Sequence, residues 1–321
     1  MTLPTGPIPP FDDIPGVWLR LAVHVHTTDS DGWLNPVMQR RYHSWGGFDV
    51  LVITDHDRFT PEPAGNDDLL IIGGTEISLV APKSRGPLHV LGIGITRQPE
   101  IDESASLRGA ALAIRACGGL PYLAHPVWSG LWTDEVDGID ECAGVEIFNG
   151  SSHMEQMRGH SDTHIDIWLT MGHRLQLIAT DDTHYPGFDA FLAWINVRAR
   201  EKSREAILEA LTSGRFYSTS GPRITELSVS EGAVSVRTTP VRSIAMLANP
   251  PFGAAINAGR QALTFRGQPL RTADGQTYEG ISDGDLLTGA TFPWTPGMRY
   301  VRIVITDEHG RMAWSNPIWA D

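Results

Sequence analysis

The chain has 321 residues, of which 41% are hydrophobic and 20% are charged, as is typical of a globular protein with room for one large domain and a smaller one. Its formal net charge of −13 argues against a general nucleic-acid-binding protein, because such proteins hold phosphates with clustered Lys and Arg. An acidic balance fits a plain solvated surface, and it also fits carboxylates that are partly neutralised by metal ions.

Short apolar runs alternate with segments of helical spacing from about residue 19 to residue 197. The apolar runs predict strands over residues 19–25, 49–55, 69–79, 89–95, 120–125, 144–149, 174–181 and 190–197. Helices are predicted over residues 35–46 and 103–119, the second of which ends on Gly118-Gly119. Strands alternating with helices favour an α/β fold with a parallel sheet or barrel, in which the chemistry takes place at the carboxyl ends of the strands.

The pattern changes after a further predicted helix over residues 203–216, which Ser203 caps and Gly214 ends. From about residue 223 onward, short alternating runs are broken by Gly, Pro and Asp-Gly turns. This texture predicts an all-β, sandwich-like module. We therefore expect two domains, residues 1–221 and 222–321.

Residues that can bind metal recur at the ends of the predicted strands. His24 and His26 are two residues apart at the end of the first strand, so both side chains point to the same face. His89 stands at or just before the start of its strand, and the other members follow theirs. The complete set is His24, His26, Asp31, His56, Glu76, His89, His125, Asp182 and His184.

A single histidine at such a position is more often structural than a ligand. Six histidines and three carboxylates, however, would carry a large uncompensated desolvation cost if they were only buried. Divalent cations compensate that cost, and imidazole with carboxylate suits Zn, Mn or Fe. The set contains no Cys, which argues against a thiolate-rich structural zinc site. The pattern therefore predicts a multinuclear metal centre.

Over about residues 18–221 the sequence resembles the polymerase-and-histidinol-phosphatase (PHP) family of metal-dependent hydrolases. The resemblance rests on HVHTTDSDG, ITDHD, GTEIS, LHVLG, YLAHP, EIFNG and the DTH of ATDDTH, in the order that this family shows. It implies a distorted (β/α)7 barrel of the PHP type and a site for three divalent metal ions. Asp31 stands where some members have a histidine. By motif, the implied ligands are His24, His26, Glu76 and Asp182 for one metal, Asp31, His56 and His184 for a second, and Glu76, His89 and His125 for a third, with Glu76 bridging.

A finer resemblance points to one branch of the family. The segment WLNP after the first motif, VEIFNG, GRFYSTSGP and the terminal RMAWSNPIW look like the branch that includes hydrolases of carbamate esters such as carbaryl. Members of that branch commonly carry an extra C-terminal β module. The finer match lowers the expectation of phosphate esters without excluding them.

The leading functional hypothesis is a phosphoesterase that cleaves small phosphate esters with a metal-bound hydroxide. Asp182 is the first candidate for moving a proton to the leaving group, and His184 is the second. One alternative is hydrolysis of carboxyl or carbamate esters at the same centre, because the motif loops are poor in Arg and Lys. A second alternative is a non-catalytic metal-binding or interaction protein.

The remaining expectations concern cofactors, partners and location. No dinucleotide fingerprint or P-loop is present, so we expect no organic cofactor besides the metal ions. We expect a small-molecule ester as substrate, no nucleic acid, no membrane and a possible homo-oligomer. The N-terminus has no signal-peptide pattern, and Cys117 and Cys142 make no disulfide framework, so the chain is predicted to be cytoplasmic.

Overall fold

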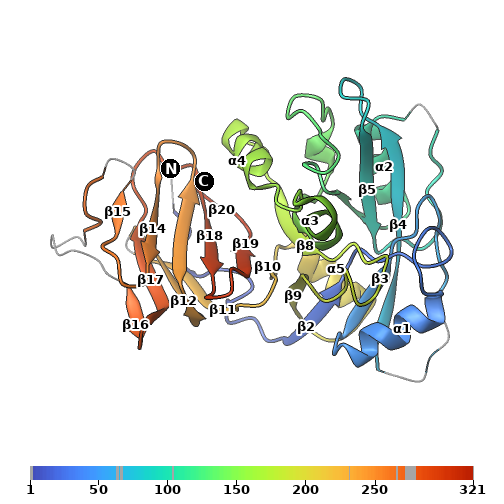
Figure 1. Cartoon of the computed structure of the whole chain (residues 1–321). Coiled ribbons are helices and arrows are strands. Elements are labelled where there is room, and N and C mark those ends of the chain that lie inside the picture. The colour runs from blue at the N-terminus through green and yellow to red at the C-terminus, as the bar shows by residue number, and fades with distance from the viewer. Residues whose placement is uncertain are drawn as a thin grey trace. The chain divides into compact units, whose positions relative to one another are not determined.

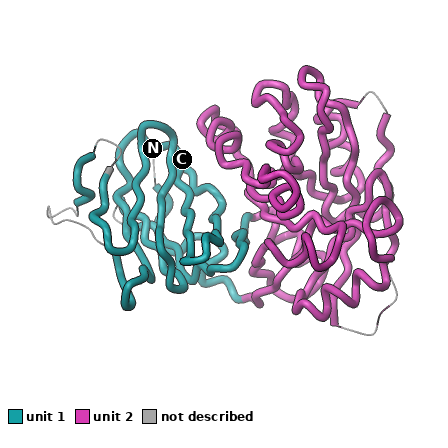
Figure 2. Tube along the Cα trace, in the orientation of Figure 1, with its two compact units in different colours: residues 1–15, 214–321 teal, residues 16–213 magenta. Residues whose placement is uncertain are grey.

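The computed structural model describes residues 3–62, 65, 68–102, 105–230, 232–264, 267–271 and 280–320 (Figure 1). The chain divides into two compact units (Figure 2). The larger unit is Gly16–Ser213, and the smaller unit joins Met1–Pro15 to Gly214–Asp321. The predicted boundary after residue 221 lies beyond this division, and the N-terminal residues were expected in the first domain. The extents of the two domains stay a prediction.

Eight strands of the larger unit lie in the order β9-β2-β3-β4-β5-β6-β7-β8. Each predicted strand of this region is confirmed, with its ends shifted by a few residues. The central strand β3 is buried at all four positions, which explains its continuous apolar sequence. The strands are β2 (Val17–Ala22), β3 (Val50–Ile53), β4 (Leu70–Val80), β5 (Pro87–Ile93), β6 (Leu120–Leu123), β7 (Gly144–Asn149), β8 (Gln176–Thr180) and β9 (Trp194–Ala199).

The sheet of the larger unit is mixed rather than parallel throughout. Pairs β2–β3, β3–β4, β6–β7 and β7–β8 are parallel, whereas β2–β9, β4–β5 and β5–β6 are antiparallel. Strand β5 follows β4 through a short turn closed by the bond from Ala81 N to Gly86 O, and such a connection can only reverse the chain. An isolated parallel bridge between Val25 and Thr183 joins the chain just past β2 to the chain just past β8. A closed barrel stays a prediction.

The three helices that the sequence predicted are confirmed, and each begins at a side-chain cap. Asn35, Ser106 and Ser203 accept a bond from the backbone N–H three residues on. The helices are α1 (Pro36–Trp45), α2 (Leu107–Ala116), α3 (Gly150–Gln156), α4 (Asp162–Met171), α5 (Arg204–Thr212) and the 3₁₀ turn η1 (Ile139–Glu141).

The smaller unit is all β among its described residues, as the sequence predicted. One sheet has the order β1-β11-β12-β17-β16, and the other contains β15-β14-β13-β18-β19-β10 with β20 paired to β18. One apolar cluster draws on both sheets, for example Val236 from the first and Ile303 from the second, as in a sandwich. The strands are β1 (Gly6–Pro7), β10 (Phe216–Thr219), β11 (Ile224–Ser230), β12 (Ala233–Val241), β13 (Ser243–Ala248), β14 (Gly253–Asn257), β15 (Leu263–Thr264), β16 (Ile281–Asp283), β17 (Leu286–Pro293), β18 (Tyr300–Thr306), β19 (Met312–Ser315) and β20 (Ile318–Trp319).

The N-terminal segment belongs to the smaller unit because it adds a strand to it. Gly6 and Pro7 pair with Val229 and Ser228 of β11, and Ile8 N donates to Leu227 O at 2.8 Å. Among the described residues, no helix is both long and apolar enough to cross a membrane.

Candidate metal centre

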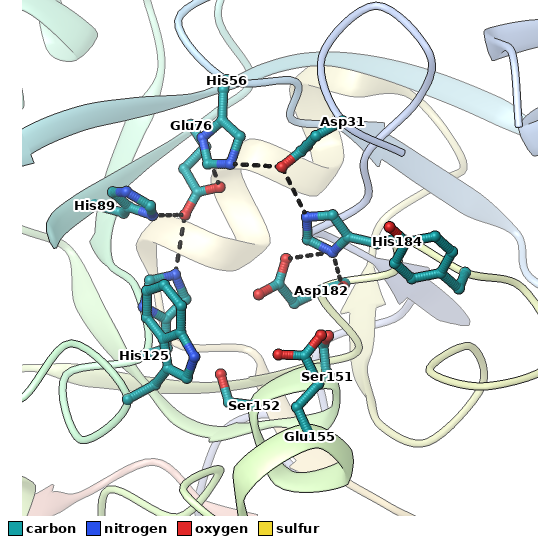
Figure 3. A pocket seen from close by; sticks show the side chains of 12 residues that line it. Asp31, His56, Glu76, His89, His125, Ser151, Ser152, Glu155, Asp182 and His184 are labelled. Carbon is teal, nitrogen blue, oxygen red and sulfur yellow. Dashed lines mark hydrogen bonds and ion pairs between the residues drawn. The ribbon is translucent and has the colours of Figure 1, made fainter. Parts of the chain in front are cut away.

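The structure brings all nine predicted ligands to one edge of the larger unit, and Figure 3 shows seven of them, without His24 and His26. Most of them follow their strands, as predicted. Two placements differ: Glu76 lies in the middle of β4, because that strand continues to Val80, and His89 lies inside β5 rather than at its start. These two strands run antiparallel and pair Glu76 with Leu91, which places the Glu76 and His89 side chains close together at this edge.

Four of these side chains form one group of donor atoms that all lie within 4.8 Å of one another, which we call the tetrahedron after the coordination that it would give to one ion. His24 Nε2 lies 3.1 Å from His26 Nε2, from Glu76 Oε2 and from Asp182 Oδ1. His26 Nε2 lies 3.1 Å from the same two carboxylate oxygens. Ligands about 2.0–2.1 Å from a tetrahedral cation would lie about 3.3–3.4 Å apart, so this group is nearly the right size for one ion. It matches the first predicted ligand set.

Hydrogen bonds among these side chains do not account for all the polar atoms of the tetrahedron. Asp182 Oδ1 is buried and makes no hydrogen bond, although two ring nitrogens lie within 3.1 Å of it. A neutral His24 whose proton lies on Nδ1 presents only the lone pair of Nε2 to the carboxylate oxygens of Glu76 and Asp182. A cation between these atoms would satisfy all of them. The residues therefore fit a divalent metal.

Two further groups of ligand atoms lie beside the tetrahedron. Asp31 Oδ2 is 3.5 Å from the Nε2 atoms of both His56 and His184, as the second predicted set requires. Glu76 Oε1 is 2.9 Å from His89 Nδ1 and 3.1 Å from His125 Nε2, as the third set requires. Glu76 thus contributes one oxygen to each of two groups.

The grouping differs from the predicted sets in two places. His26 lies close enough to join Asp31, His56 and His184, and His56 lies close enough to join Glu76 and His89. The assignment of each residue to a particular ion therefore stays a prediction.

Residues outside the ligand set orient the histidines. His24 Nδ1 donates to Glu146 Oε1 at 2.7 Å, and His184 Nδ1 donates to the carbonyl oxygen of Asp182 at 2.8 Å. These two bonds place the proton on Nδ1 and leave Nε2 with its lone pair, which is the form that binds metal. His125 Nδ1 shares a hydrogen bond of 3.1 Å with Ser129 Oγ, which orients the ring.

Glu146 is the most heavily bonded of these residues, and the sequence interpretation gave it no role. Besides His24, its carboxylate accepts from the backbone N–H of His125 at 2.8 Å, the hydroxyl of Thr180 at 2.7 Å and the amide of Asn149 at 2.9 Å. The sequence does contain an indication of this role. Glu146 is the one acidic residue of the apolar strand GVEIFN, and an acidic side chain can be buried there only if several donors bind it.

The loop that carries Asp31 is held by Asp55. Its carboxylate accepts from Thr27 N at 2.7 Å, Thr27 Oγ1 at 2.8 Å and Ser30 Oγ at 2.8 Å. Gly32 completes the loop, since a Cβ there would lie 2.5 Å from the His26 carbonyl oxygen.

The charges of the site stabilise one another. Burial disfavours the imidazolium of His26, yet the negative charges of Asp182 and Glu76, each 3.1 Å from its Nε2, outweigh burial and raise the pKa of His26 to about 9. Burial likewise opposes ionisation of Glu76 and Asp182, but the charge on His24 holds the pKa of both carboxyls well below the usual range. Both carboxylates therefore stay ionised near neutral pH, the form that binds metal.

Backbone strain is concentrated at the same edge. His125 has a φ of 25° and Asp182 a φ of 57°, and both lie in the left-handed region that few non-glycine residues adopt. Such strain persists where the surrounding structure fixes it, and it clusters at functional sites.

A cavity of about 270 Å³ opens onto these ligands (Figure 3). Seven of the nine predicted ligands line it, and His24 and His26 lie behind them. Trp128 also lines the cavity, whereas Trp33 is exposed beside Tyr185. The lining residues that the sequence interpretation missed are Ser151, Ser152, Glu155 and Tyr185.

No protein-family model and no curated protein sequence matches this chain. A two-domain protein from Bacteroides vulgatus, described as containing a predicted PHP-like metal-dependent phosphoesterase, has a similar structure with a TM-score of 0.51 and 17% sequence identity. That similarity covers 96% of this chain and 95% of the other.

Two other solved structures are similar over part of the chain. An amidohydrolase from Chromobacterium violaceum shows 18% identity and a TM-score of 0.39 over 53% of this chain and 89% of its own. A lesion-specific endonuclease from Pyrococcus furiosus shows 13% identity and a TM-score of 0.40 over 61% of this chain and 56% of its own. The likeness to the Bacteroides protein, which extends over nearly the whole chain, shows a shared fold, and that fold is of the PHP-like kind that the sequence motifs predicted.

Proposed function

We propose that this protein is a metal-dependent hydrolase of ester bonds and that its substrates are small phosphate esters. The observation that carries the proposal is the tetrahedron of His24, His26, Glu76 and Asp182, with donor atoms 3.1 Å apart and an unsatisfied carboxylate oxygen. Asp31, His56 and His184 would hold a second ion, and Glu76 with His89 and His125 a third. When bound, such ions would lower the pKa of a water molecule and stabilise negative charge on the ester.

Of the two predicted proton-transfer residues, Asp182 fits less well. Although burial opposes its ionisation, the neighbouring imidazoles hold its pKa well below the ordinary range, so it carries no proton near neutral pH. His184 lines the cavity, and its bond to Asp31 outweighs burial and raises its pKa. His184 is therefore the better candidate of the two, but because its Nδ1 already donates to Asp182 O, it would give a proton to the leaving group from Nε2, and only while Nε2 holds no metal ion.

The leaving group provides a test of this role. His184→Gln should slow hydrolysis of an alkyl ester, whose leaving group needs a proton, more than that of a p-nitrophenyl ester, whose leaving group does not. An equal loss for both substrates would instead indicate that His184 acts only by holding metal.

One observation favours a second candidate function. The residues that line the cavity include no Lys or Arg, which a site for a phosphate group commonly provides. Carboxyl or carbamate esters carry no such charge, so their hydrolysis at the same centre is the alternative, in line with the finer sequence resemblance.

A panel of four substrates tests both functions. We would measure hydrolysis of p-nitrophenyl phosphate, bis-p-nitrophenyl phosphate, p-nitrophenyl acetate and 1-naphthyl methylcarbamate by metal-loaded protein. His26→Ala and chelation should abolish turnover, whereas His309→Ala, at an exposed histidine of the smaller unit, should leave it unchanged. Turnover of the phosphates alone supports the proposal, and turnover of the acetate or carbamate alone supports the alternative. Turnover of none would support a non-catalytic role.

A further inference from the structure

Helix α3 supplies the wall of the cavity that faces the ligands. Ser152 and Glu155 are three residues apart on this helix, so they share a face, and both line the cavity. Figure 3 shows them across the cavity from His56 and Glu76, with the Ser152 hydroxyl pointing inward.

Hydrogen bonds of Asn149 connect helix α3 to the predicted ligand Asp182. The Asn149 side chain caps the helix by accepting from Ser152 N at 2.9 Å, and its amide donates to Asp182 Oδ2 at 3.1 Å. In addition, Ser151 N donates to Asp181 O at 2.8 Å. The positions of Ser152 and Glu155 are therefore fixed relative to Asp182.

Glu155 is the one carboxylate lining the cavity that the ligand groups leave unused. Asp31, Glu76 and Asp182 all belong to those groups, whereas Glu155 belongs to none. Among the described residues, no ion pair or hydrogen bond engages its side chain. No Lys or Arg lines the cavity, so no such side chain on its wall pairs with Glu155.

An unneutralised carboxylate at this place discriminates between esters by charge. A phosphate monoester carries two negative charges above neutral pH, a diester carries one, and a carboxyl ester carries none. Repulsion by Glu155 grows with the charge on the substrate and acts against monoesters. The carboxylate can in turn accept a hydrogen bond from a hydroxyl or ammonium group of the substrate.

We propose that Glu155 and Ser152 form the subsite for the part of the substrate beyond the ester group, and that Glu155 selects monoanionic diesters or neutral esters over dianionic monoesters. The inference rests on the proposed function, because it takes the ligand edge as the place of the ester group. Glu155 acts here on specificity and not as a metal ligand.

Anion binding tests the inference without relying on turnover. Methyl phosphate and dimethyl phosphate differ by one charge at pH 8, and calorimetry would give their affinities for metal-loaded protein. Glu155→Gln should increase the affinity for methyl phosphate about three- to fivefold relative to the affinity for dimethyl phosphate, and Glu155→Lys should increase this ratio further. Added salt should reduce both effects. Glu308→Gln removes the same charge from an exposed position of the smaller unit and should leave the ratio unchanged.

The kinetic counterpart uses two substrates with the same leaving group. In Glu155→Gln, kcat/KM for p-nitrophenyl phosphate should rise by a similar factor relative to that for bis-p-nitrophenyl phosphate. An affinity ratio that Glu155→Gln and Glu155→Lys leave unchanged, or the failure of both anions to bind the wild-type protein, would overturn the inference. Binding that depends on Glu155 in a protein that hydrolyses none of the four panel substrates would overturn the proposed function alone.

Discussion

Glu146 shows how one buried carboxylate can determine the geometry of several metal ligands. It accepts four hydrogen bonds, from His24, His125, Asn149 and Thr180. Glutamine at this position would turn an NH2 group toward two of those donors, because each carboxylate oxygen accepts two of the four bonds and only one terminal atom of glutamine accepts.

We therefore expect Glu146→Gln to weaken metal binding by about ten- to a hundredfold, the usual effect of removing a partner that orients a ligand. Competition with a chelating dye would measure the affinity, and Glu308→Gln serves as the matched control. Unchanged affinity would mean that His24 keeps its orientation without the carboxylate.

His43 provides a residue-scale test in acid, away from the ligands. It is fully buried, donates from Nδ1 to Gln39 O at 3.1 Å and packs edge-on against Phe48. Burial, together with the charge on Arg20, lowers its pKa to about 4 against the opposing effect of the Gln39 bond. The ordinary value in an unfolded chain is about 6.5.

Between these two pKa values the unfolded chain binds a proton that the folded chain does not. The free energy of unfolding should therefore fall as the pH drops from about 6.5 to 4, by roughly 3 kcal/mol from this residue. Urea unfolding of chelated protein should show a shallower pH dependence in His43→Leu than in the wild type. Equal slopes would show that His43 titrates normally in the folded chain.

At the scale of an element, the N-terminal cap of helix α5 contributes to the stability of the fold. Ser203 Oγ accepts from Ala206 N at 3.3 Å and satisfies one of the free donors of the first turn. Ser203→Ala should lower the free energy of unfolding by about 1 kcal/mol, whereas Ser203→Gly should cost only a few tenths. Denaturant unfolding checks this order, and a larger loss in the glycine variant would show that flexibility and not the cap matters there.

Elements could be located from the sequence where burial leaves a clear pattern. Strand β3 is apolar throughout because it is buried on both faces, and α2 begins at a serine that caps it. The direction of β5 could not be predicted from its composition, because that direction depends on the short turn between Ala81 and Gly86. The α3 wall was missed because neither Ser152 nor Glu155 belongs to the metal motifs.

At the scale of the whole molecule, the meeting of the nine predicted ligands at one edge could be foreseen because most of them follow strands, at whose ends side chains from distant segments meet. The place of the N-terminal residues could not be predicted from the sequence. Gly6 and Pro7 form a two-residue strand, which is too short to leave a pattern of its own and is defined by its pairing with β11. Cytoplasmic location, homo-oligomerisation and the absence of nucleic-acid and membrane partners stay predictions.

Removal of metal should affect the two units differently. Ligand binding at a hundredfold excess over Kd stabilises a folded protein by about 2.7 kcal/mol, so chelation should lower the Tm of the larger unit by about 5–10 °C. Hydrogen exchange should accelerate at residues 24–31 and 180–184 and stay unchanged in β12 of the smaller unit. Uniform acceleration in both units would place the effect of the metal outside the predicted site.

The metal content of the purified protein tests the central claim most directly. Elemental analysis by mass spectrometry, after growth with Zn, Mn and Fe and removal of loosely bound ions, should find three divalent ions per chain in the wild type. His26→Ala should bind fewer, because His26 is a corner of the tetrahedron and lies within reach of a second group. A wild-type protein that retains no divalent metal, or a His26→Ala variant with undiminished content, would contradict the account.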